Sequence, residues 1–141
     1  MNQHPERSGG RSSTSLRSAQ NASAAKSKDA AFWSTLDRLV AESQIVIDRP
    51  RGTPHPRYPE FIYPLDYGYL DGTTAADGDG IDVWIGSQPD RALTAIVCTV
   101  DLIGRDAEIK LLLGCTREEA QIILATHNSG PQAATLIVRG Q

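Results

Sequence analysis

The sequence is poor in the residues that build disulfide frameworks and membrane spans. Its 141 residues include two cysteines, Cys98 and Cys115, which form no CxxC pair, and 6% aromatic residues. We therefore expect reduced, buried thiols in place of a disulfide framework. No apolar run approaches the length of a transmembrane helix, and the N-terminus lacks the apolar segment of a secretory signal. These absences predict a cytoplasmic protein that makes no membrane contact.

The sequence also lacks a basic folded region. Residues 30–141 contain nine Lys and Arg against fifteen Asp and Glu, a net charge of −6, whereas residues 1–29 contain five against two. Proteins that bind nucleic acid normally present a basic face, so no nucleic-acid partner is expected. Residues 1–29 are rich in Ser, Ala, Arg, Gln and Gly and predict a disordered tail, with a transit peptide as an alternative. Residues 30–141 are long enough for one domain.

Apolar periodicity predicts two helices and several strands. Apolar residues recur at helical spacing over residues 32–40, and Thr116 with Glu119 forms a capping-box pattern that opens a second helix ending near His127. Four prolines within residues 50–59 predict a long irregular loop. Extended or strand segments are expected at residues 45–47, 61–69, 81–85, 92–102, 109–113 and 134–138.

The most informative segment is the acidic loop, residues 77–82 with the sequence DGDGID. It places three carboxylates in six residues at the start of a predicted strand, and its glycines allow a tight turn. Clustered carboxylates repel one another unless a cation lies between them, and Mg²⁺ prefers oxygen ligands. A solvated acidic turn is the alternative. The loop fails as an EF-hand because Asp82 and Gln88 occupy the positions that require Gly and Glu.

Three arginines lie in or beside the proline-rich loop, at Arg49, Arg51 and Arg57, together with His55. Guanidinium groups are well suited to bind phosphate oxygens through paired hydrogen bonds. The same arginines could instead act as counter-charges to the acidic loop. Both interpretations stay open from the residues alone.

Two adjoining motifs carry a family resemblance. Residues 61–69 (FIYPLDYGY) and residues 77–83 (DGDGIDV), which begin ten residues after Tyr67, resemble the soluble family I inorganic pyrophosphatases. Those enzymes show F-Y-P-x-N-Y-G-Y and D-G-D-P-(apolar)-D-V at the same separation, and residues 47–49 (IDR) are similar to their V-D-R segment. The resemblance covers residues 45–113. It implies an α+β fold, a small OB-like β-barrel with an N-terminal helix and one further helix packed on it.

The resemblance also implies an activity and a set of site residues. The activity is Mg²⁺-dependent hydrolysis of pyrophosphate, or a related phosphoanhydride, to phosphate, with Mn²⁺ as the alternative ion. By position, Asp77, Asp79 and Asp82 correspond to the family's metal ligands, and Asp79 to the base that activates water. The remaining assignments are Asp106 as a further metal ligand, and Arg49, Tyr67 and Lys110, joined by Arg51 and Arg57 in place of missing cations, as phosphate-binding residues.

The chain departs from the family in several places. The family's N-terminal hairpin has no counterpart, and its late Tyr-Lys pair is replaced by His127-Asn128 at the nearest position. The alternative is therefore a non-catalytic or weakly active module that binds a metal or a phosphorylated ligand. Activity on nucleotide anhydrides is not expected, since the sequence indicates neither an aromatic platform nor a glycine-rich nucleotide loop. Whether the chain forms a homo-oligomer is left open.

Overall fold

The computed structural model describes residues 8–141 and contains two helices and six strands. The elements in chain order are α1 Ser8–Ala41, β1 Gln44–Arg49, β2 Asp66–Asp71, β3 Ile81–Ile85, β4 Leu93–Asp101, β5 Asp106–Leu113, α2 Arg117–Thr126 and β6 Gln132–Val138. The chain divides into two compact units after Leu36, and the second unit, Asp37–Gln141, contains the whole sheet and α2. The strands predicted from apolar periodicity are all present, with shifts at their ends.

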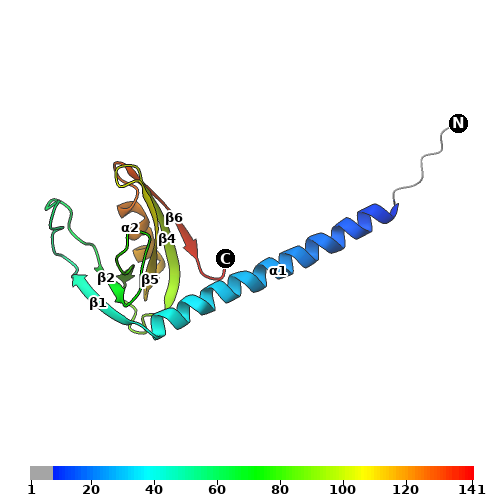
Figure 1. The fold of residues 1–141 in the computed structure, drawn as a ribbon, viewed down its shortest axis with the longest axis horizontal. Coiled ribbons are helices and arrows are strands. Elements are labelled where there is room, and N and C mark those ends of the chain that lie inside the picture. The colour runs from blue at the N-terminus through cyan, green and yellow to red at the C-terminus, as the bar shows by residue number, and fades with distance from the viewer. Residues whose placement is uncertain (1–7) are drawn as a thin grey trace. The chain divides into compact units, whose positions relative to one another are not determined.

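The six strands form one sheet in the order β1-β2-β3-β5-β4-β6 (Figure 1). Neighbouring strands are antiparallel except β3 and β5, which run parallel. β1 and β6 therefore stand at the two edges of the sheet. The closed OB-like barrel expected from the family resemblance is accordingly an open sheet in the described part of the chain, because no pairing joins these edge strands.

The core lies where α2 packs against one face of the sheet. Ala120 and Ile123 of α2 are buried in one cluster with Trp84 of β3 and Leu112 of β5, and Figure 1 shows α2 beside the strands of this face. The predicted capping box opens α2: the Thr116 hydroxyl accepts from the Glu119 backbone N–H, and the Glu119 carboxylate accepts from the Thr116 N–H. This arrangement fixes the start of α2 against the sheet.

α1 begins earlier than the sequence periodicity predicts. Residues 1–7 of the expected tail lie outside the described residues, but the backbone is helical from Ser8 onward. Residues 8–29 contain Ala, Arg, Lys and Gln, which favour helix formation, although Ser is more frequent than any of them, and they carry no apolar stripe. The division into a tail of residues 1–29 and a domain of residues 30–141 stays a prediction. Within residues 8–141, no helix is both long and apolar enough to span a membrane.

Gly68 of β2 provides a test of the sheet. A Cβ built at this position would overlap the Val46 carbonyl oxygen of the paired strand β1. We therefore expect Gly68→Ala to force the two strands apart and to lower the free energy of unfolding by about 1–3 kcal/mol. Urea unfolding measures this change. Gly104→Ala is the control, because its Cβ would meet only the mobile end of the Asp106 side chain; equal losses for both variants would contradict the packing of β1 on β2.

Candidate functional site

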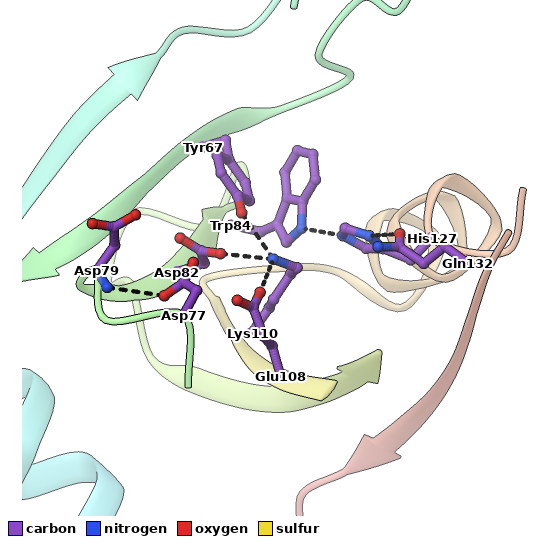
Figure 2. A network of polar contacts seen from close by, with 9 residues as sticks. All are labelled: Tyr67, Asp77, Asp79, Asp82, Trp84, Glu108, Lys110, His127 and Gln132. Atoms are coloured by element: carbon purple, nitrogen blue, oxygen red, sulfur yellow. Dashed lines mark hydrogen bonds and ion pairs between the residues drawn. The ribbon is translucent and has the colours of Figure 1, made fainter. Parts of the chain in front are cut away.

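The acidic loop forms a tight turn before β3. Gly78 adopts a φ of 88°, which favours glycine. The Asp77 carboxylate accepts a hydrogen bond from the Asp79 backbone N–H at 3.0 Å, and the Ala75 N–H donates to the Asp79 carbonyl at 2.6 Å. The turn thus leaves Asp82 as the second residue of β3. In Figure 2 the Asp79 carboxylate points outward from the loop, away from Lys110.

Lys110 of β5 is the centre of a polar network (Figure 2). Its ammonium group donates to Asp82 Oδ2 at 2.6 Å, to Tyr67 Oη at 3.0 Å and to Glu108 Oε2 at 3.1 Å. The Lys110 side chain is only 7% exposed, so all three of its protons are used within the protein. The network joins three strands that are adjacent in the sheet, β2, β3 and β5.

The charges of this network keep Lys110 protonated. Burial alone would lower the pKa of Lys110, but the groups around it, with Asp82 in direct contact, raise that pKa above its ordinary value. Burial also raises the pKa of Tyr67, and its hydroxyl therefore stays neutral. The nearby Asp82 carboxylate also raises the pKa of Tyr67, while the positive charge of Lys110 lowers it. The ammonium and the Asp82 carboxylate form the ion pair that organises the site.

Glu108 is a member of the network that the sequence analysis did not assign. Burial raises the pKa of Glu108 and the Asp77 carboxyl beside it raises the pKa further, while Lys110 lowers it. Asp82 and Glu108 thus place two carboxyl groups on one ammonium, and the Asp77 carboxyl lies beside Glu108. Glu108 precedes Lys110 by two residues on a strand, a spacing that places both side chains on one face, so strand alternation is the signal that identifies it.

Other predicted residues lie farther from Lys110. Asp106 is exposed at the first position of β5, on the face shared by Glu108 and Lys110. Arg49 donates from Nη1 to the Asp48 carbonyl at 3.3 Å. Burial raises the pKa of the Tyr63 hydroxyl, and the nearby Arg49 guanidinium lowers it. Arg51 and Arg57 are exposed, and both use their backbone N–H groups in hydrogen bonds that fix the proline-rich loop.

A buried chain of polar groups lies on the other side of Tyr67. The Trp84 indole N–H donates to His127 Nε2 at 3.0 Å, and His127 Nδ1 lies 2.8 Å from Gln132 Oε1. These partners assign a neutral imidazole with its proton on Nδ1. Burial lowers the pKa of His127, the hydrogen bond to Gln132 raises it, and the positive charge of Lys110 lowers it. The chain links β3, the end of α2 and β6.

The carboxyl groups of the network are of the type that binds magnesium, but they are not arranged as a metal site. Mg²⁺ binds oxygen ligands, which Asp82 and Glu108 at Lys110 and Asp77 beside Glu108 offer by type. In residues 8–141, however, no three Asp, Glu, His or Cys side chains converge on one metal position. The donor set fits the ion by type, and the ammonium of Lys110 holds two of these carboxylates in the structure.

Comparison with known proteins identifies the family. The family model for inorganic pyrophosphatase matches residues 60–135, which is 76 of the 141 residues. The chain belongs to the inorganic pyrophosphatase family. The part matched to this pyrophosphatase model includes the acidic loop and Lys110, whereas Arg49 and α1 lie before it.

No curated protein matches the chain. Among solved structures, the chain is similar to the inorganic pyrophosphatase of the bacterium Helicobacter pylori, with 14% sequence identity and a TM-score of 0.46. That similarity covers 68% of this chain and 81% of the bacterial pyrophosphatase. The family resemblance stated from the two sequence motifs is therefore confirmed by the family model.

The buried ion pair of Lys110 predicts that replacing this lysine lowers the free energy of unfolding much more than replacing an exposed arginine. Lys110→Met leaves buried carboxylates without their cation, and we expect it to lower the free energy of unfolding by about 3–5 kcal/mol. Arg38→Met is the control: it removes an exposed Arg38–Glu42 pair on α1 and should cost about 0.2–0.5 kcal/mol. Urea unfolding of both variants measures the difference. Similar small losses would contradict a structural role for Lys110.

His127 predicts a pH dependence of stability. Because the pKa of His127 is lowered in the folded chain, the unfolded chain binds a proton below about pH 6.5 that the folded chain does not. The contribution of neutral His127 is therefore complete above this pH and is lost as pH falls towards the folded-state pKa. Urea unfolding between about pH 7.5 and pH 5 should show this decline. The decline should be smaller in His127→Gln, and an identical decline in both proteins would contradict the prediction.

Proposed function

We propose that this chain hydrolyses a phosphoanhydride, as the name of its family indicates for inorganic pyrophosphate, and that it does so with Mg²⁺, or with Mn²⁺ as the alternative ion. The observation that carries the proposal is the network around Lys110, where Asp82 and Glu108 contact one ammonium and the Asp77 carboxyl lies beside Glu108. An excess of carboxyl groups over cations is the electrostatic setting that favours a divalent cation. We also propose a cytoplasmic location, which the two free thiols support.

Asp77, Asp82 and Glu108 are the residues that would hold the metal, with Asp79 and Asp106 as further ligands. When bound, Mg²⁺ neutralises phosphate oxygens and lowers the pKa of a coordinated water. Among these residues, Asp79 is exposed and its carboxylate points outward. We assign to Asp79 the role of accepting the proton of the attacking water, because a base must have a free carboxylate oxygen within reach of solvent.

The cations of the site would bind the phosphates. Lys110 Nζ has its donors occupied by Tyr67, Asp82 and Glu108, so a phosphate oxygen would replace one of these partners. Arg49 lies at the end of β1, opposite Tyr67 in the register of the two strands. Arg51 and Arg57 have exposed side chains on the neighbouring loop and would bind the remaining oxygens through their paired donors.

Phosphate release from pyrophosphate in the presence of Mg²⁺ tests this function. We expect Asp79→Asn to reduce kcat by about 100-fold or more, since loss of a general base typically costs a factor of 10²–10⁴. Glu118→Gln is the matched control, because Glu118 is an exposed carboxylate in the first turn of α2. Chelation of Mg²⁺ should abolish the wild-type activity. Equal rates for wild type and Asp79→Asn at saturating Mg²⁺ would favour the non-catalytic module.

A further inference from the structure

An aromatic cavity of about 590 Å³ lies beside the Lys110 network. The residues whose rings line it are His55, Tyr58, Phe61, Tyr63, Tyr67 and Trp84. Neighbouring rings among them have centroids 4.7–6.3 Å apart, so they form one continuous cluster. The sequence did not predict this ring cluster. The reason is that the proline-rich loop folds back on itself and brings distant rings together.

The lining of this cavity is unsuited to a bare polyanion. In the described part of the chain, none of the lining residues is Lys or Arg, and Asp101 is the one acidic residue among them. His127 is held neutral by burial and by its hydrogen bond from Trp84, and His55 Nδ1 accepts hydrogen bonds from two backbone N–H groups. Pyrophosphate alone would gain nothing here. A volume of this size matches the usual range of about 300–1,000 Å³ for small-molecule sites.

The cavity suits a flat, uncharged ring. Aromatic side chains bind such rings by stacking, without selecting among them by hydrogen bonds. At the rim, Tyr58 is 58% exposed and Ile103 is 80% exposed, so two large apolar side chains remain partly in water beside the opening. Asp101 Oδ1 accepts hydrogen bonds from the backbone N–H groups of Ile103 and Gly104 in the turn after β4. The other carboxylate oxygen of Asp101 could then accept a hydrogen bond from a donor on a bound ring.

Tyr67 connects the cavity to the network. Its ring lines the cavity, and its hydroxyl accepts the hydrogen bond from Lys110 Nζ. Tyr67 is thus the one residue shared by the cavity lining and the Lys110 network in the described part of the chain. A molecule with a ring in the cavity would have its phosphates directed past Tyr67 towards Lys110.

We propose that the substrate of this site is a phosphoanhydride with a flat ring on one end, of the kind represented by a nucleoside diphosphate. This substrate assignment rests on the proposed hydrolytic function. In the step, the oxygen of a water bonds to the terminal phosphorus while the bond from that phosphorus to the bridging oxygen breaks. The bridging oxygen keeps the electron pair and leaves with the ring-bearing phosphate. One water proton stays on the released phosphate, and the other passes to Asp79 and from there to solvent.

The kinetic test compares ADP with pyrophosphate in the presence of Mg²⁺. We expect a higher kcat/KM for ADP. Tyr58→Ala should lower that value by roughly 5- to 150-fold, the range of one stacked ring, and leave pyrophosphate hydrolysis unchanged. Ile62→Ala is the matched control, because Ile62 is an exposed apolar residue of the same loop that does not line the cavity. Hydrolysis of pyrophosphate without hydrolysis of ADP would overturn the substrate assignment and leave the hydrolytic function standing.

A binding measurement separates the two proposals if neither compound is hydrolysed. Calorimetric titration with AMP and with inorganic phosphate reports the ring site without any reaction. Tighter binding of AMP than of phosphate, weakened by Tyr58→Ala and unaffected by Ile62→Ala, would support the ring site while the hydrolytic function fails. Equal binding of AMP and phosphate, or AMP binding that is the same in Tyr58→Ala, would overturn the ring site.

Discussion

The buried ammonium of Lys110 is the constraint on which the rest of this site depends. Burying a charge is costly unless ionic and hydrogen-bonding partners surround it, and Lys110 obtains them from Tyr67 on β2, Asp82 on β3 and Glu108 on its own strand. The sheet order places these three strands side by side, so the network requires this register of the sheet. The same contact sets the electrostatics of the site, because the ammonium holds together carboxylates that would otherwise repel one another.

In the proposed function, the family membership and the cavity beside Tyr67 bear on different parts of one substrate. The carboxyl groups around Lys110 would bind a phosphate chain and the ion that neutralises it. The aromatic rings of the cavity would bind the group attached to that chain, because the cavity lining within residues 8–141 contains no Lys or Arg for a charged phosphate. If the substrate carries a ring, the group that leaves in hydrolysis is a ring-bearing phosphate. The departures of this chain from the family pattern would then reflect a different leaving group and not only a weakened site. The Trp84–His127–Gln132 hydrogen bonds are consistent with this proposal, because they keep His127 neutral, so that its imidazole adds no positive charge beside the cavity.

Local signals predicted much of this structure, and long-range contacts account for what they missed. Period-two apolar residues predicted β3 at Ile81–Ile85, and Thr116 with Glu119 predicted the start of α2. Strand alternation also contains the signal for Glu108. By contrast, Trp84 and His127 are 43 residues apart, and no local pattern indicates that they share a hydrogen bond. The gathering of rings around Tyr67 likewise depends on how the proline-rich loop folds back, and the open sheet depends on pairings that no single segment encodes.

The central claim is that this site cleaves a phosphoanhydride bond in a molecule that carries a ring. The most direct measurement is a ³¹P NMR time course of the full chain with Mg²⁺ and equal amounts of ADP and pyrophosphate in one sample. The account predicts that the ADP signals decline first, with AMP and inorganic phosphate appearing in equal amounts, while pyrophosphate persists. An unchanged spectrum, or loss of pyrophosphate with ADP intact, would contradict it.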